Sequence, residues 1–291
     1  MSKKNQAKTK KYRFTGRTKD VEGRPVREIV GTGEDSLEGG WIESEKNFSQ
    51  SGNSWVHPRA VVMGKARVFG DAQVWGGTVS ENASISGQAS VFGGSISGDS
   101  EISGNACIRM SPSIFGKSII SGGVIGDSAY IENAIISGGE INDNAIIRDC
   151  RITGGKVADH VEIAREAEIS GGTFLNSSTI LGAQISGGSF SGNCHVSGDA
   201  QVSGGSISQK AHISGGKISG TAAITESAVV TGGLITGGLI SANSAVSGGR
   251  VTGGSMWGSV HISGGDVTGG SIWGKVHISG GQVEGGSVWG D

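Results

Sequence analysis

Large apolar residues recur at every fifth or sixth position through most of the chain. The series begins at Val56, continues through positions such as Ile136, and reaches Val288 without a missed step, 43 positions in all. This period matches neither the 3.6-residue period of an amphipathic helix nor the strict alternation of a two-sided hairpin strand. The pattern therefore predicts many short strands, each of which points one large apolar side chain inward before the chain turns a corner.

Two near-copies close to the C-terminus set the length of the repeat. The sequence VHISGG starts at Val260 and again 16 residues later at Val276. Three steps of five or six residues then make one coil of 16 to 18 residues, and each strand pairs with the strand one coil away. We expect an all-β parallel β-helix, a triangular solenoid of about 14 coils, because 43 positions are shared among three sides.

Glycine-rich corners support this prediction. The chain has 55 Gly among 291 residues but only 3 Pro, which excludes a collagen repeat and a Pro-rich linker. Five-residue steps carry Gly-Gly corners, as at Gly138 and Gly139, because Gly adopts the backbone angles of a tight corner without strain. Six-residue steps instead carry a small residue two positions before the inward one. Cys150 and Cys194 occupy this position, so we expect buried, structural thiols.

The pattern resembles that of the bacterial hexapeptide-repeat (transferase hexapeptide) superfamily, in which an aliphatic residue recurs every six positions after a small one. Ala66-Arg67-Val68 and Ala72-Gln73-Val74 show it, and residues 54–291 follow it with many sides shortened to five. The resemblance implies a left-handed coil. The N-terminal portion is similar to uncharacterised enterobacterial and prophage proteins described as putative transferases or polymer-forming proteins. Stretches such as Gly39-Gly40-Trp41-Ile42-Glu43 carry that similarity.

The N-terminal part divides into a tail and a cap. Residues 1–30 carry ten Lys or Arg against three acids, and residues 1–11 form a disordered basic tail. We expect residues 12–53 to form a small β cap with a turn at Glu22-Gly23-Arg24-Pro25. Trp41 and Phe48 of this cap should lie over the first coil of the parallel β-helix, which comprises residues 54–291. The tail is the only candidate for a nucleic-acid contact, which we do not favour because no aromatic residues alternate with its lysines.

Other features of the sequence bound the location and the chemistry. No stretch approaches the ~20 apolar residues that span a membrane, so we expect no membrane partner. The three cysteines lack CxxC spacing, which indicates neither a disulfide framework nor a zinc site. We therefore expect a cytoplasmic protein, or alternatively a virion component, without a cofactor. The C-terminal coil has no cap in the sequence, and we expect its edge to invite pairing with another molecule.

Two groups of outward apolar residues are the candidate partner-binding sites. Trp257, Trp273 and Trp289 each follow an inward position on the same side, so three indoles should stack in one outward column. A second group, the central apolar patch, combines neighbouring columns. It consists of Phe115, Ile119, Tyr130, Ile135 and Ile146. Exposed and contiguous apolar residues mark contact sites more often than chance placement does.

Histidines are the candidates for metal binding and for catalysis. Four of them precede an inward residue on one side and should form an outward column, which favours a surface ladder over a metal site because no carboxylate accompanies them. These are His195, His212, His261 and His277. His160 follows Asp159 at a corner, close to Glu162 and Glu166 in sequence, and is the one candidate acid or base.

The leading hypothesis is a non-catalytic β-helical scaffold, associated with a phage or prophage by resemblance, that binds copies of itself or a protein partner. No step between residues 56 and 288 exceeds six residues, so the wall contains no inserted loop from which acyltransferases of this superfamily build a pocket. An acyltransferase-like or metal-dependent enzyme with a site between subunits is the first alternative. A carbohydrate-binding solenoid that uses the Trp column is the second.

Overall fold

The structure is a computed structural model, and its contacts divide the chain into two compact units, Met1–Asn133 and Ala134–Asp291. Each unit is described by itself. The residues that the structure describes are 10–34, 36–133, 135–149, 151–164, 168–170, 173–175, 177–182, 184–186, 189–198, 201–203, 206–208, 212–214, 217–219, 223–224, 229–231, 234–236, 239–240, 243, 245–247, 250–252, 255–259, 261–264, 266–269, 271–280, 283–285 and 289. The expected disordered tail and Cys150 lie largely or wholly outside them.

The first unit begins with an antiparallel hairpin. Strands β1 (Tyr12–Val21) and β2 (Arg24–Gly31) pair through a turn at Glu22 and Gly23, whose φ angles of 54° and 75° are those of a two-residue hairpin turn. The turn is thus shorter than the predicted one, because Arg24 and Pro25 belong to β2. Pro25 is tolerated there because β2 begins with these residues.

The hairpin leads into the first parallel pairings. Strand β3 (Glu38–Ile42) pairs antiparallel with β2 and parallel with β4 (Trp55–Val62). Between them lies the 3-10 helix η1 (Glu45–Asn47), the only helix among the described residues, which Ser44 and Asn47 cap reciprocally. Phe48 follows η1 and is 1% exposed, with Tyr12 stacked on its ring at 4.9 Å.

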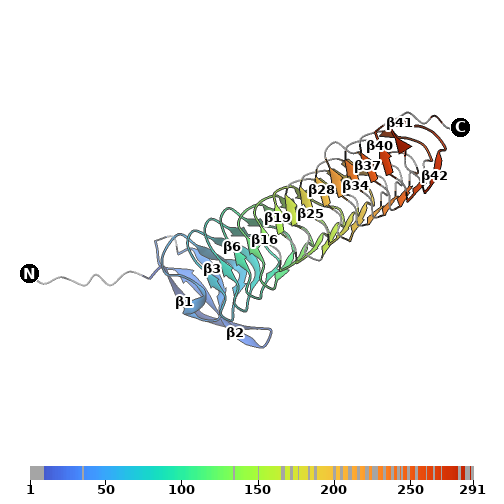
Figure 1. Ribbon diagram of the computed structural model, residues 1–291. Helices are drawn as coiled ribbons and strands as arrows, with labels where there is room; N and C mark the ends of the chain where they lie inside the picture. The colour runs from blue at the N-terminus through green and yellow to red at the C-terminus, as the bar shows by residue number, and fades with distance from the viewer. Residues whose placement is uncertain are drawn as a thin grey trace, which may run out of the picture. The chain divides into compact units, whose positions relative to one another are not determined.

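The rest of the first unit is a parallel β-solenoid, in which short strands follow one another around the core (Figure 1). Most strands pair with the strand three places along the chain, so that residues 17 or 18 positions apart lie side by side, as Glu101 does with Ser84 and Ile119. Its strands are β5 (Arg67–Val68), β6 (Gln73–Val79), β7 (Ser84–Ile85), β8 (Ser90–Val91), β9 (Ser95–Ile96), β10 (Glu101–Ile102), β11 (Cys107–Ile108), β12 (Ser113–Phe115), β13 (Ile119–Ile120), β14 (Val124–Ile125) and β15 (Tyr130–Glu132).

The inward positions predicted from the five- and six-residue steps are confirmed throughout this unit. Each of them is at most 1% exposed, and they form stacks in which one aliphatic side chain lies on the next, as Ile102 does between Ile85 and Ile120. The fully buried members are Val56, Val62, Val68, Val74, Val79, Ile85, Val91, Ile96, Ile102, Ile108, Ile114, Ile120, Ile125 and Ile131. These stacks are the core of the unit.

The predicted small residue two positions before an inward one is also buried. Ala66, Ala72 and Ala83 are completely buried there. Where Ser replaces Ala, the hydroxyl donates a hydrogen bond to the carbonyl three residues earlier: Ser100 Oγ to Ser97 O at 2.7 Å, for example. The corner thus accepts a polar side chain because the local backbone satisfies it.

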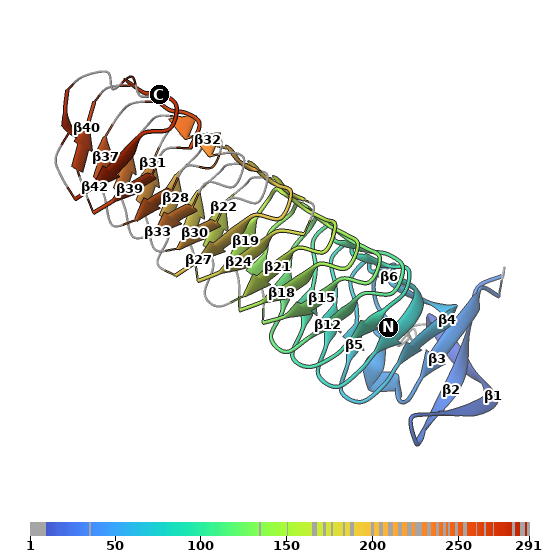
Figure 2. The ribbon, with the colours of Figure 1, turned by 90° about the vertical axis from the view of Figure 1, so that its right-hand side faces the viewer.

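The second unit continues the same construction with strands of two or three residues, and its coils are stacked as parallel strands (Figure 2). The first stack of paired strands contains β16 (Ile135–Ile136), β19 (Arg151–Thr153), β22 (Glu168–Ser170), β25 (Gln184–Ser186), β28 (Gln201–Ser203), β31 (Lys217–Ser219), β34 (Leu234–Thr236), β37 (Arg250–Thr252), β40 (Asp266–Thr268) and β43 (Val283–Glu284). The second contains β17 (Glu140–Ile141), β20 (Lys156–Val157), β23 (Thr173–Leu175), β26 (Ser189–Ser191), β29 (Ser206–Ser208), β32 (Ala223–Ile224), β35 (Leu239–Ile240), β38 (Ser255–Met256) and β41 (Ser271–Ile272). The third contains β18 (Ile146–Arg148), β21 (Glu162–Ala164), β24 (Thr179–Leu181), β27 (His195–Ser197), β30 (His212–Ser214), β33 (Val229–Thr231), β36 (Ala245–Ser247), β39 (His261–Ser263) and β42 (His277–Ser279).

Inward residues are buried wherever the structure describes their side chains in this unit, with Ile278 only partly buried near the end. Phe174, Ile180 and Val196 are at most 1% exposed. Cys194 is 1% exposed and its thiol contacts the Ser191 carbonyl at 3.2 Å, which confirms the predicted buried thiol. The side chains of Ile207 and Ile240, predicted to point inward, lie outside the described residues.

Candidate interaction surfaces

The three C-terminal tryptophans form the predicted outward column. The Trp257 and Trp273 rings lie 5.7 Å apart between centroids at an interplanar angle of 3°, and the Trp273 and Trp289 rings lie 5.5 Å apart at 4°. Met256 and Ile272, the residues before the first two indoles, are paired in register on β38 and β41, which places the indoles one coil apart. Even inside the stack, Trp257 and Trp273 keep 40% and 39% of their surface exposed.

A second aromatic column, not predicted from the sequence, lies on the first unit. The His57 and Trp75 rings are 3.5 Å apart at 10°, and the Trp75 and Phe92 rings are 6.0 Å apart at 3°. Trp75 and Phe92 are 44% and 50% exposed. Each ring follows an inward valine of β4, β6 or β8, the same position that the C-terminal tryptophans take. This shared position is the signal that could have found the column.

The polar residue beside this column fixes its first ring. Nε2 of His57 lies 3.1 Å from Oε1 of Gln73, and Nε2 of Gln73 donates to the carbonyl of Asn53 at 2.8 Å. Burial lowers the pKa of His57, while the hydrogen bond to Gln73 opposes that shift. A neutral imidazole therefore stacks on the Trp75 indole near neutral pH.

The residues of the central apolar patch are divided between the two units. In the first unit, Phe115 and Tyr130 make an edge-to-face contact at 4.7 Å and 80°, and Ile119 is 38% exposed. In the second unit, Ile135 is 41% exposed and Ile146 is partly buried on β18. Each half thus contains one exposed isoleucine beside partly buried apolar residues, and their combination into one patch stays a prediction.

The histidine column of the second unit consists of two stacked pairs. His195 and His212 lie in register on β27 and β30, with ring centroids 4.7 Å apart at 4°. His261 and His277 repeat this arrangement on β39 and β42 at 4.9 Å and 6°. A column of hydroxyls that sequence reasoning missed runs beside them, two residues further along each strand. It consists of Ser197, Ser214, Thr231, Ser247, Ser263 and Ser279.

Stacking also affects the protonation of the first pair. Burial, and to a smaller extent the charge of His212, lowers the pKa of His195 from its ordinary 6.5. Thr179, the neighbour of His195 on the other side, carries no charge. As the pH falls, the unfolded chain therefore binds a proton at this position before the folded chain does. This contribution is neutral to stability above about pH 7 and becomes destabilising as the pH drops through 6.5.

Replacing His195 by Asn should reduce the acid sensitivity of the fold. We expect the midpoint of thermal unfolding to fall less between pH 7.5 and pH 5 in His195→Asn than in the unchanged protein, by about 1 °C for a partly exposed imidazole. Ser197→Ala, a change on the same strand that removes no titrating group, should leave the pH dependence intact. Circular dichroism melts at the two pH values measure the difference, and equal dependence in all three proteins would contradict the prediction.

The surroundings of the histidines bear on metal binding and on acid–base chemistry. Among the described residues, no group of three or more His, Cys, Asp or Glu side chains is arranged to hold a metal ion. His160, at a corner with φ 63°, has its Nε2 3.0 Å from the side-chain nitrogen of Asn144. The amide nitrogen of Asn144 is a donor, so Nε2 of His160 accepts this hydrogen bond. Glu166 lies outside the described residues.

No family model matches the chain, and no curated protein matches it. In the described part of the chain, no helix has the length and apolar character required to cross a bilayer.

Proposed function

We propose that the protein is a non-catalytic β-solenoid scaffold that associates with copies of itself, or with a protein partner, through the column of Trp257, Trp273 and Trp289. The observation that carries this proposal is that three indoles, parallel within 4°, remain 39% to 74% exposed after they stack on one another. Stacking within the chain therefore explains only part of their placement. Contiguous exposed aromatic surface is the kind of surface that protein interfaces bury.

The solenoid suits such a function because it repeats one surface position at a fixed spacing. Ring stacks of this kind hold each side chain against its neighbour, so less conformational entropy is lost when a partner covers them. The column of His57, Trp75 and Phe92 on the first unit offers a second surface of the same construction. His57 and Trp75 lie within strands β4 and β6, and Phe92, Trp257 and Trp273 directly follow strands β8, β38 and β41. The strands therefore fix the positions of these rings, which favours a scaffold over a flexible binding segment.

We also propose the shape, the number of coils, the N-terminal cap and the handedness of the solenoid. Pairing of most strands with the third strand along supports three sides and a triangular section, and the unbroken spacing of inward residues supports about 14 coils. The hairpin of β1 and β2 with η1 would cap the first coil, as the burial of Phe48 and its bridge to Val68 suggest. Left-handed winding, membership of the hexapeptide-repeat superfamily, and a phage or prophage association in the cytoplasm or a virion rest on the resemblance.

Replacing Trp273 by Ala removes the middle ring of the column. If this column is an interface, the change should weaken self-association at least about 30-fold, the equivalent of about 2 kcal/mol for an aromatic residue at the centre of an interface. Sedimentation velocity over a concentration series measures the dissociation constant directly. The midpoint of thermal unfolding should change little, because Trp273 lies outside the core.

Lys275→Gln serves as the matched control, since Lys275 is exposed on the corner next to Trp273 and leaves the indoles in place. It should assemble as the unchanged protein does. A self-association constant that is the same in Trp273→Ala, in Lys275→Gln and in the unchanged protein would exclude the column as the site of self-association.

A further inference from the structure

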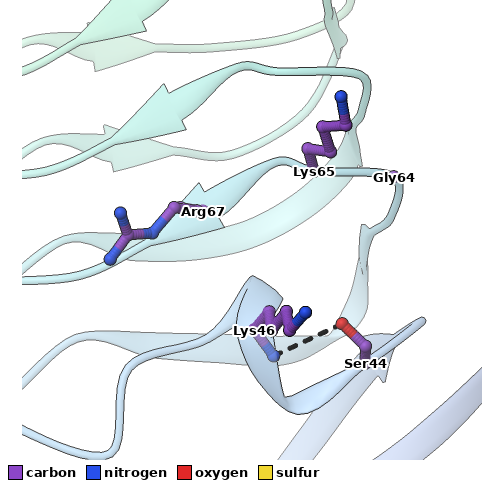
Figure 3. Close-up of a pocket in the computed structure, with 5 residues that line it drawn as sticks. All are labelled: Ser44, Lys46, Gly64, Lys65 and Arg67. Atoms are coloured by element: carbon purple, nitrogen blue, oxygen red, sulfur yellow. Dashed lines mark hydrogen bonds between the residues drawn. The ribbon is translucent and has the colours of Figure 1, made fainter.

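Two adjoining hollows lie where η1 meets the first coil of the solenoid. The larger, of about 370 Å³, is lined by Ser44, Lys46, Gly64, Lys65 and Arg67. The smaller, of about 240 Å³, shares Lys46 and Arg67 with it and extends past Phe69. Figure 3 shows where the cations originate: Lys46 belongs to η1 on one wall, and Lys65 and Arg67 come from the turn and strand of the facing wall, with their charged ends directed away from Lys46 and from each other.

None of these three cations has an ion-pair partner in the described part of the chain. The acids of the neighbouring segments are engaged elsewhere. Glu43 accepts the backbone N–H of Gly64 at 2.6 Å and faces Arg24 at 3.4 Å. Glu45, although it lines the smaller hollow, pairs with Lys10 at 3.0 Å.

Glu81 is the remaining acid beside this site. Glu81 lies one coil from Lys65, and its backbone carbonyl accepts a hydrogen bond from the backbone N–H of Lys65. Its side-chain carboxylate instead accepts the backbone N–H of Gly98 at 2.6 Å. The carboxylates of Glu43 and Glu81 thus accept hydrogen bonds from backbone N–H groups, and the carboxylate of Glu45 pairs with Lys10, which lies outside the hollow. None of these carboxylates forms an ion pair with Lys46, Lys65 or Arg67, and Arg67 contacts only the face of the Phe69 ring, 5.6 Å from its centroid, among the charged and aromatic groups of the described residues.

We propose that the exposed side chains of Lys46, Lys65 and Arg67 turn toward this hollow and bind a tetrahedral oxyanion there, a phosphate or sulfate group. Arg67 suits this role because its planar guanidinium can donate two parallel hydrogen bonds to one oxyanion, while the two lysines act as mobile point charges. Ser44 adds a hydroxyl at the rim. Because all three cations reach solvent, binding should be strongest at low ionic strength and about tenfold weaker at about 0.2 M salt.

The preference for phosphate or sulfate over a carboxylate follows from charge and shape. Three donors on two facing walls match an anion that presents oxygens in several directions, whereas a planar carboxylate presents two in one plane. The site is independent of the aromatic columns, so its occupation should leave the oligomeric mass unchanged.

Titration with sodium pyrophosphate and, separately, with sodium sulfate tests this proposal on the full chain at low ionic strength. Amide chemical shifts report the location, and we expect the largest saturable changes at Lys46, Gly64 and Lys65. The double variant Lys65→Gln/Arg67→Gln should weaken the apparent affinity at least about tenfold. Acetate at equal ionic strength should cause no saturable change.

Lys117→Gln is the matched control. Lys117 follows Gly116, with φ 71°, as Lys65 follows Gly64, with φ 66°, so both lysines occupy the same kind of corner, but Lys117 has no part in either hollow. Binding should be unchanged in this variant. Shift changes spread evenly over lysines of both corners, or undiminished affinity in the double variant, would overturn the proposal. Preserved amide spectra in the variants verify that the fold is intact.

Discussion

Ile102→Ala is expected to lower the free energy of unfolding by about 2–5 kcal/mol, the cost of removing a fully buried aliphatic side chain whose space cannot close. Ile102 is completely buried and lies between Ile85 and Ile120, one coil away on either side. The three side chains form one stack, so the cavity is bordered by rigid strands that cannot collapse into it. Urea unfolding followed by far-ultraviolet circular dichroism measures the loss.

The preceding residue provides the control. Glu101 is exposed on the same two-residue strand and points outward, so Glu101→Ala should change the free energy of unfolding by no more than about 0.5 kcal/mol. Similar losses in the two variants would contradict the assignment of inward and outward positions, and with it the register of the solenoid.

Gly139→Ala is expected to destabilise the second unit by about 2–4 kcal/mol, through backbone strain together with overlap. The φ angle of Gly139 is 92°, which an L-residue rarely adopts, and a Cβ there would lie 2.6 Å from the carbonyl oxygen of Gly155. That oxygen belongs to the backbone of the next corner, so it cannot move aside without displacing the coil. The midpoint of thermal unfolding measures the effect.

The adjacent residue separates strain from overlap. Gly138 also has a φ of 92°, but a Cβ on it would meet no atom within 4 Å. Gly138→Ala should therefore lower the free energy of unfolding by only about 1 kcal/mol. Backbone strain destabilises the folded variant, but Ala also reduces the conformational entropy of the unfolded chain, which offsets part of that strain. Equal losses for the two variants would show that coil-to-coil spacing at this corner is not what requires glycine.

The inward residues were predictable because their spacing depends only on local geometry. A strand of two or three residues followed by a tight corner returns to the core after five or six residues, and the burial of Val68, Ile114 and Phe174 follows from that count alone. The small corner position was predictable for the same reason, since its neighbours are the residues next to it in sequence. The hydrogen bond from Ser118 Oγ to the Phe115 carbonyl explains why Ser can replace Ala at this corner position.

The aromatic columns were predictable only in part. The tryptophans occur at a constant stride of 16, whereas His57, Trp75 and Phe92 are different ring types separated by 18 and 17 residues. Their common feature is the position after an inward valine, which becomes evident once the register is known. The same register brings the histidines into pairs.

The oxyanion hollow could not be predicted from the pattern of apolar residues. It depends on η1 lying against a corner about 20 residues further along the chain, and no periodic signal encodes that contact. It depends as well on which donors occupy Glu43 and Glu45. The junction between η1 and this corner occurs once in the chain, so the pairing of its side chains follows from the tertiary structure and not from a repeated sequence pattern.

Hydroxyl-radical footprinting across a concentration series tests the central claim most directly, because it reports the solvent exposure of individual indoles as the protein associates. The account predicts that Trp257, Trp273 and Trp289 are reactive in the dilute protein and become protected together as the sedimentation coefficient rises, while Phe69, outside both columns, stays reactive. Association that leaves the three indoles as reactive as in the dilute protein would contradict it.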